Sequence, residues 1–129
     1  GGERPLKVWG DGSPIRDFIY SKDVASGMMK VMELGYNKPV NIGSGNGVTI
    51  QEIADNIANL MPDKCDVVWD KSKPSGDKIR IMSTTRAESL GIKPEVSLHE
   101  GIKKTIEWYN NQNVNLEDRY NAFTDKSYL

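Results

Sequence analysis

The segment "NIGSGNGV", residues 41–48, has the glycine spacing most suggestive of chemistry in this sequence. Glycine-rich turns between a strand and a helix can bind dinucleotide phosphates when they read G-x-G-x-x-G and an acidic residue follows about 20 positions later. Gly43 and Gly45 supply the first two glycines, and Asp70 could supply the acid. Val48, however, stands at the third position, where a β-branched side chain prevents close helix–strand packing. The spacing therefore favours a tight connection that needs positive φ over a phosphate-binding loop.

Other groups that could act as acid, base or nucleophile lack partners at the required spacing. A tyrosine followed four residues later by lysine would have a lowered phenol pKa and could hold a cofactor ribose, but no tyrosine here has lysine at that position. His99, the only histidine, falls inside a predicted helix cap, and Cys65, the only cysteine, falls in a predicted strand. The sequence thus predicts no catalytic residue, and it excludes a zinc site built from histidine and cysteine within one chain.

Composition narrows the class of protein further. A chain of 129 residues fits one domain or part of a larger one. Its 17 basic and 18 acidic side chains create no positive field for nucleic acid or an anionic membrane. A single cysteine allows no disulfide within the chain, and no apolar run approaches the roughly 20 residues that span a bilayer. We expect a soluble protein in a reducing, cytoplasmic setting.

Alternating strand-like and helix-like segments predict an α/β fold with a small mixed sheet and several helices. S/T-x-x-E pairs mark three helix starts, because each side chain can bond a free backbone N–H at the other position. The pairs are Thr49/Glu52, Thr85/Glu88 and Ser97/Glu100. We expect strands near residues 15–20, 39–42 and 66–69, and helices near 22–34, 50–61, 85–90 and 98–110.

The helix expected at 22–34 has an apolar stripe rich in methionine. Val24, Met28, Val31 and Met32 recur at helical spacing, and Gly35 stands where a C-cap glycine would. Because unbranched methionine fills irregular gaps, we interpret the stripe as core packing.

Four blocks of the sequence, in order, resemble one family. They are "LKVWGDGSPIRDFIYSKDVASGMM", "NIGSGNGVTIQEIADNI", "KPSGDKIR" and "TTRAESLGIKPEVSLHEGIKKTIEWY". Together they resemble the C-terminal half of extended short-chain dehydrogenase/reductases (SDRs) acting on nucleotide sugars. Within this group, the form W-G-x-G-x-x-x-R-(D/E)-F is most similar to that of the GDP-L-fucose synthases.

The resemblance implies a chain that carries the substrate-binding part of an extended SDR fold and lacks the Rossmann half. A complete relative would bind NADP and use a Tyr-x-x-x-Lys pair, both contributed by that other half, so this chain is expected to hold no cofactor and to be inactive alone. Residues 1–111 would form the substrate-binding domain, and the polar residues 112–129 a loosely held tail or interaction arm. The resemblance thus implies a separate Rossmann half as a partner.

The resemblance also implies three substrate-binding residues. Trp9 matches the tryptophan that lines the nucleotide-sugar site, and an indole offers a broad apolar face to a base or sugar. Arg16 matches the arginine that grips the diphosphate, for which its planar fork is suited. Arg80 matches the basic residue that completes the anion site, and Lys78 is a weaker candidate beside it. The expected ligand is a nucleotide diphosphate sugar.

Departures from the family pattern leave the base and the sugar open. Lys22 and Ser83 replace residues that are usually acidic, and Asp66 stands where fucose synthases can carry an arginine that contacts the nucleotide. The alternative function is a non-enzymatic module that binds a small ligand or another protein. Apolar surface that would pack on a Rossmann half should promote self-association, so we expect a homo-oligomer.

Overall fold

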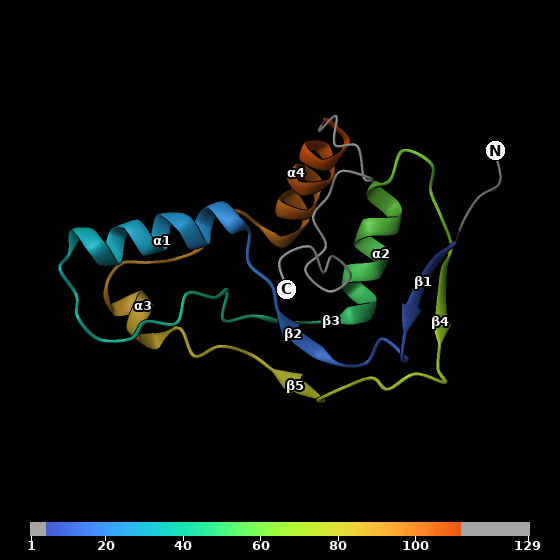
Figure 1. Cartoon of the computed structure of the whole chain (residues 1–129), viewed down its shortest axis with the longest axis horizontal. Coiled ribbons are helices and arrows are strands. Elements are labelled where there is room, and N and C mark those ends of the chain that lie inside the picture. Colours follow the sequence, from blue (N-terminus) through green and yellow to red (C-terminus); the bar gives the residue numbers. More distant parts are fainter. Residues whose placement is uncertain (1–4, 112–129) are drawn as a thin grey trace, which may run out of the picture.

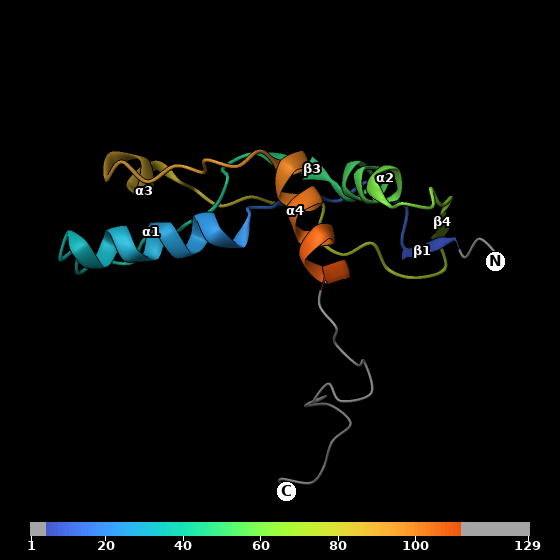
Figure 2. The same ribbon diagram turned by 90° about the horizontal axis from the view of Figure 1, so that it is seen from above.

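The computed structural model describes residues 5–111, which form two small sheets and four helices. The expected α/β class with a mixed sheet and several helices is confirmed, although the strands divide between two sheets. Figures 1 and 2 show a flat, elongated molecule with α1 and α3 at one end and α2, β1 and β4 at the other. The proposed tail, 112–129, lies outside the described residues.

The first sheet is a parallel pair formed by β1, Leu6–Trp9, and β4, Val67–Asp70. Their register aligns Leu6 with Val67 and Trp9 with Asp70. β4 confirms the strand expected near 66–69, whereas β1 was not predicted because its four residues lie among charged and glycine-rich neighbours.

The second sheet has the order β3-β2-β5 and is mixed. β2, Ile15–Asp17, pairs antiparallel with β3, Gly47–Thr49, and parallel with β5, Ile79–Arg80. β2 occupies only the first half of the strand expected at 15–20. β3 directly follows the glycine-rich turn, in which Gly45 has the expected positive φ of 70°.

Helix α2, Ile50–Leu60, begins with the predicted capping box. The Glu52 N–H donates to Thr49 Oγ1 at 3.1 Å, and the Thr49 N–H donates to Glu52 Oε2 at 2.7 Å. Ala54 and Ala58 are buried on this helix, which packs against α4, Leu98–Asn111. At the start of α4 the Glu100 N–H donates to Ser97 Oγ at 3.3 Å, as the sequence predicts for that cap.

Helix α1, Ser21–Glu33, ends as expected with Gly35 at a φ of 59°. The predicted core role of its methionines is wrong, because Met28 is 58% exposed and Met32 is 73% exposed. The helix instead buries Asp23 and Gly27. A Cβ added to Gly27 would lie 3.1 Å from side-chain atoms of Ile42 and Ile92, so this close approach uses the glycine face of the helix.

Two further expectations need correction. Residues 39–42 form no strand within residues 5–111. A side-chain hydrogen bond holds this segment instead, in which Arg86 Nη1 donates to the Pro39 carbonyl at 2.5 Å.

Helix α3, Thr85–Ser89, has Thr84 rather than Thr85 at its N-cap. The Thr84 hydroxyl donates to Glu88 Oε1 at 2.6 Å, so the threonine–glutamate pair forms one residue earlier than predicted and without a side-chain bond to the backbone.

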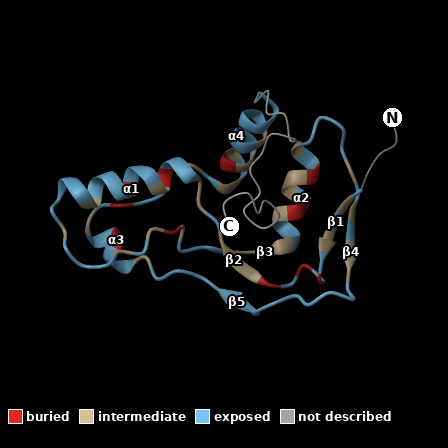
Figure 3. Ribbon diagram, in the orientation of Figure 1, coloured by how far each residue is buried: buried red, intermediate tan, exposed pale blue. Residues whose placement is uncertain are grey.

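The described core is small (Figure 3). Its buried apolar residues are Ala54, Ala58, Ala87 and Ile92. None of residues 5–111 belongs to a helix that has both the length and the apolar character needed to cross a membrane. Several large apolar side chains are exposed to solvent, among them Met28, Met29 and Met32 on α1.

Candidate functional site

Arg16 and Arg80 stand at paired positions of two neighbouring strands. β2 and β5 run parallel, and the Cα atoms of these arginines are in register. Side chains at paired positions of adjacent strands project from the same face of a sheet. The structure therefore brings together the two arginines that the resemblance assigns to an anion site.

Both guanidinium groups lie at Asp77, in the connection that precedes β5. Arg16 Nη1 donates to the carbonyl oxygens of Asp77 and Ile15, at 2.8 Å in each case. Arg80 Nη2 donates to Asp77 Oδ2 at 2.5 Å, with side-chain exposures of 76% for the arginine and 62% for the aspartate. An ion pair this exposed contributes only about 0–1 kcal/mol to stability. An anion from solution can therefore replace the Asp77 carboxylate at Arg80 at small cost.

Trp9 lies in the other sheet, at the end of β1, and its side chain is 68% exposed. Lys73 Nζ lies 5.7 Å from the centroid of the indole, which is within the range of a cation–π contact. Lys73 and Asp77 belong to the same connection from β4 to β5. Residues 71–78 thus run from the tryptophan to the arginines and form the structural link between them.

This connection is held to the turn after β1 by Ser75. The Asp11 N–H donates to Ser75 Oγ at 3.3 Å, and the Ser75 hydroxyl donates to Asp11 Oδ1 at 3.1 Å. Hydrogen bonds from Ser13, together with that from Ser75, keep the pKa of the Asp11 carboxyl below its ordinary value. Gly10 permits the contact, because it has a φ of 87° and a Cβ there would lie 2.7 Å from Ser75 Oγ.

The glycine-rich turn binds an anion of its own chain, the carboxylate of Asp17. Ser44 donates to Asp17 Oδ1 from its N–H at 2.8 Å and from its hydroxyl at 2.5 Å. The N–H groups of Gly45 and Met82 donate to Asp17 Oδ2 at 3.0 and 3.3 Å. Burial raises the pKa of Asp17, but these hydrogen bonds outweigh it and hold the pKa below its ordinary value.

The same contacts decide whether the turn fits a dinucleotide. A phosphate cradle needs backbone N–H groups that point at the ligand. Here the N–H groups of Ser44 and Gly45 already donate to Asp17, and Val48 replaces the third glycine of the fingerprint. The residues of this turn therefore do not fit the pyrophosphate of NADP.

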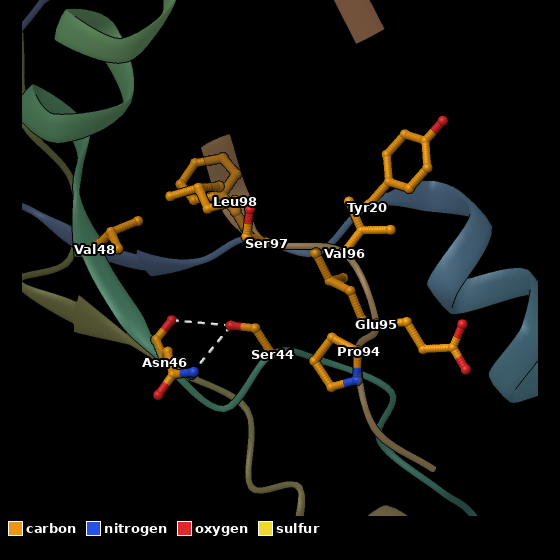
Figure 4. A pocket seen from close by; sticks show the side chains of 11 residues that line it. Tyr20, Ser44, Asn46, Val48, Pro94, Glu95, Val96, Ser97 and Leu98 are labelled. Carbon is orange, nitrogen blue, oxygen red and sulfur yellow. Dashed lines mark hydrogen bonds between the residues drawn. The ribbon is translucent and has the colours of Figure 1, made fainter. Parts of the chain in front are cut away.

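A cavity of about 250 Å³ opens on the other side of the turn, between residues 18–20 and 94–98 (Figure 4). Its polar wall includes Ser44, whose hydroxyl is engaged with the backbone of Asn46, and the Glu95 carboxylate points away from Ser44. No Trp9, Arg16 or Arg80 side chain lines it. A neighbouring apolar cavity of about 280 Å³ lies between α2 and α4.

Three side chains of this region were not singled out from the sequence: Asp17, Lys73 and Asp77. Asp17 directly follows Arg16, so strand alternation places it on the opposite face, but its hydrogen bonds join residues that are 27 to 65 positions away in the sequence. Lys73 and Asp77 lie in the quoted "KPSGDKIR" block, but their roles depend on contacts with distant residues, which a local pattern does not reveal.

Comparison with known proteins finds that the chain is similar to nucleotide-sugar enzymes over about four fifths of its own length. Residues 1–43 match the NAD dependent epimerase/dehydratase family. The chain is 38% identical over 104 residues to a probable GDP-L-fucose synthase 1 of Oryza sativa subsp. japonica, covering 79% of this chain and 31% of the relative. It is 36% identical over 112 residues to the GDP-L-fucose synthase of Escherichia coli K12, covering 79% of this chain and 35% of the relative.

The chain is also similar in structure to solved epimerases and reductases. A UDP-glucose 4-epimerase from Thermotoga maritima, solved with UDP-glucose, superposes with a TM-score of 0.73 at 32% identity over 82% of this chain and 35% of that one. A GDP-6-OMe-4-keto-L-xylo-heptose reductase from C. jejuni gives a TM-score of 0.73 at 31% identity, over 83% and 34%. The chain spans about a third of the length of these relatives.

Proposed function

We propose that this chain, a relative of the nucleotide-sugar epimerases and reductases of the NAD dependent epimerase/dehydratase family, binds the diphosphate of a nucleotide sugar between Arg16 and Arg80. The paired register of the two arginines is the observation that carries the proposal. Two planar guanidinium groups on one face of a sheet can each bond phosphate oxygens in a bidentate manner. Together they supply two positive charges for the two phosphates.

The contacts of the two arginines support this role. Both guanidinium groups donate to oxygen atoms of Asp77. Arg16 donates to its carbonyl oxygen, and Arg80 donates to its carboxylate. These acceptors hold the arginines near one another, and the exposed carboxylate contact is weak enough to be exchanged for a phosphate. Binding replaces one charged hydrogen bond by another, so the net gain comes from the second phosphate and from the rest of the ligand.

Trp9 is proposed to contact the base or the sugar of the same ligand. Trp9 is 68% exposed, and the Lys73 ammonium lies over its ring. A base or sugar ring stacked there would gain about 0.5–1.5 kcal/mol beyond the apolar area that it buries. Because several curated relatives are GDP-L-fucose synthases, a GDP-sugar is the first ligand to test.

Calorimetry with the full chain tests the proposal. GDP-mannose, GDP and UDP-glucose should bind weakly, and inorganic phosphate more weakly still, because it offers only one phosphate to the two arginines. A chain that binds phosphate as well as GDP would have an unspecific anion patch instead.

The chain alone is not proposed to catalyse hydride transfer. Residues 1–111 are proposed to be the substrate-binding domain of an NADP-dependent epimerase/reductase, whose hydride chemistry would need NADP and a Tyr-x-x-x-Lys pair from a separate Rossmann half. The glycine-rich turn does not fit the cofactor, since its N–H groups donate to Asp17. The purified chain should therefore not oxidise NADPH with any nucleotide sugar; turnover free of host reductases would contradict the proposal.

A second candidate function is a non-enzymatic interaction module, and one surface favours it. Met28, Met29 and Met32, which we call the α1 methionine face, are 58%, 55% and 73% exposed. Methionine is common on surfaces that bind proteins, because its flexible side chain adapts to its partner. A Rossmann half is the proposed partner for this face, and in its absence the face would pair two copies of the chain as a homo-oligomer.

A further inference from the structure

We propose that Asp17 is a positioning residue that fixes Arg80 beside Arg16 by closing the end of the β3-β2-β5 sheet, an inference that rests on the proposed function of these arginines. Its carboxylate accepts hydrogen bonds from the turn before β3 and from Met82, just after β5. One side chain of the central strand therefore connects both outer strands.

The need for such a connection follows from the length of β5. This strand has only two residues, Ile79 and Arg80, and both are exposed. Before the strand, the Ile15 N–H donates to the Lys78 carbonyl at 2.8 Å. After it, the Met82 N–H donates to Asp17 Oδ2 at 3.3 Å. Arg80 is paired with Arg16 in the ladder and lies between these two anchors. Loss of the second anchor therefore leaves only this two-residue ladder and the Lys78 contact to hold β5 against β2.

Strand alternation separates this anchor from the proposed ligand. Arg16 and Asp17 are consecutive residues of β2, so their side chains project from opposite faces of the sheet. Asp17 therefore does not need to touch the diphosphate in order to influence it. Its effect on binding is transmitted through the backbone of β5 to Arg80.

The packing around the carboxylate supports a built position rather than a chance contact. Gly43 is buried, and a Cβ added to it would lie 2.8 Å from Asp17 Oδ2 and 3.0 Å from Met82 Cβ. The two carboxylate oxygens accept four hydrogen bonds in all, two on each oxygen. An asparagine has one acceptor oxygen and an NH₂ group, so it cannot accept on both sides.

The test compares Asp17→Asn with Asp17→Glu, which keeps both acceptor oxygens, and with Asp63→Asn, an exposed carboxylate between α2 and β4. Amide hydrogen exchange is measured by NMR, and GDP binding by calorimetry. In Asp17→Asn, exchange should accelerate at Ser44, Gly45, Arg80 and Met82 while α2 keeps its protection. The Kd for GDP should rise about tenfold, which corresponds to about 1.4 kcal/mol.

Asp17→Glu should restore most of both properties, and Asp63→Asn should match the unmodified chain. Gly43→Ala provides a second variant in case Asp17→Asn does not fold, because its methyl group should displace the carboxylate and give the same local pattern. Unchanged exchange at Arg80 and Met82 would overturn the proposal. A change in exchange, whether confined to these residues or spread through α2, would also overturn it if the Kd for GDP stayed the same. A third contradicting result would be an Asp17→Glu variant in which neither the exchange rates nor the Kd returns towards the values of the unmodified chain.

Failure of the proposed function gives a different result. If the unmodified chain binds neither GDP nor GDP-mannose, the arginines are not a diphosphate site, and the positioning of a binding residue by Asp17 is overturned with it. If the unmodified chain binds GDP and Asp17→Asn binds equally well, only the role of Asp17 is lost.

Discussion

Arg16 and Arg80 are register partners in parallel strands, and the carbonyl and carboxylate oxygens of a single residue, Asp77, lie within hydrogen-bonding distance of their two guanidinium groups. This arrangement places two permanent positive charges on one face of a sheet. Its acceptors come from a fully exposed connection. The protein's own acceptors thus hold both side chains at neighbouring positions, which reduces the ordering cost that binding must offset.

Replacing either arginine should weaken all diphosphate ligands to a similar extent. Arg16→Ala or Arg80→Ala removes charged hydrogen bonds to phosphate, each worth about 1.5–3 kcal/mol. Calorimetry with GDP, GDP-mannose and UDP-glucose would measure the loss. Arg16→Lys keeps the charge without the planar fork and should fall between. Lys103→Ala, on the exposed side of α4, is the control. Unchanged Kd values for both alanine variants would exclude the proposed site.

Replacing Trp9 should alter discrimination rather than affinity for phosphate. Trp9→Ala removes the apolar face offered to a base or sugar, so the Kd values for GDP and UDP-glucose should converge. Trp9→Phe retains a smaller face and should preserve part of the difference. If Trp9→Ala raises the Kd for GDP and the Kd for inorganic phosphate by the same factor, the indole does not contact the base or the sugar. It would then only pack against Lys73 in the connection between β4 and β5.

The features predicted correctly from sequence depend on neighbouring residues in the chain. The Thr49/Glu52 capping box forms with both reciprocal bonds because its partners are three residues apart on one helical turn. Gly35 and Gly45 have the expected positive φ for the same local reason. The box at Thr85 was misplaced by one residue because Thr84 and Thr85 offer the same side chain.

The features that were missed depend on distant partners. Residues 39–42 have strand-like composition, yet they are tied by Arg86 and not by a ladder within residues 5–111. The α1 methionine face has core-like spacing, but periodicity shows only that a face is apolar and not what covers it. The adjacency of Arg16 and Arg80 was expected from the family resemblance and not from any local pattern, because it rests on the pairing of β2 with a two-residue strand.

Acidification should remove the stability contributed by Asp17. The hydrogen bonds hold its pKa in the folded protein below the ordinary value of 3.8, so the ionised carboxylate stabilises the fold above that pH. This contribution is lost as the pH falls through the lowered pKa. Urea unfolding should show Asp17→Asn to be less stable than the unmodified chain at pH 7, with a gap that narrows below about pH 4.

Two other carboxyls contribute to the same acid sensitivity in the unmodified chain. The pKa of Glu52 is lowered by its bonds from Thr49, and that of Asp11 by its bonds from Ser13. Asp17→Asn should therefore retain part of the loss of stability on acidification. A gap between the two proteins that is as large at pH 2.5 as at pH 7 would contradict a role for the ionised form of Asp17.

Charging the α1 methionine face should reduce self-association without unfolding the chain. Met28→Lys combined with Met32→Lys replaces two exposed apolar side chains, and exposed substitutions usually change the free energy of unfolding by less than about 0.5 kcal/mol each. Sedimentation at several concentrations should show the unmodified chain associating and the double variant shifted towards monomer, because two opposed copies would bring like charges together. Val68→Lys, at an exposed apolar position of β4, is the matched control and should associate as the unmodified chain does. If the double variant and the unmodified chain associate equally, some other surface carries the contact and the methionine face is not the docking surface.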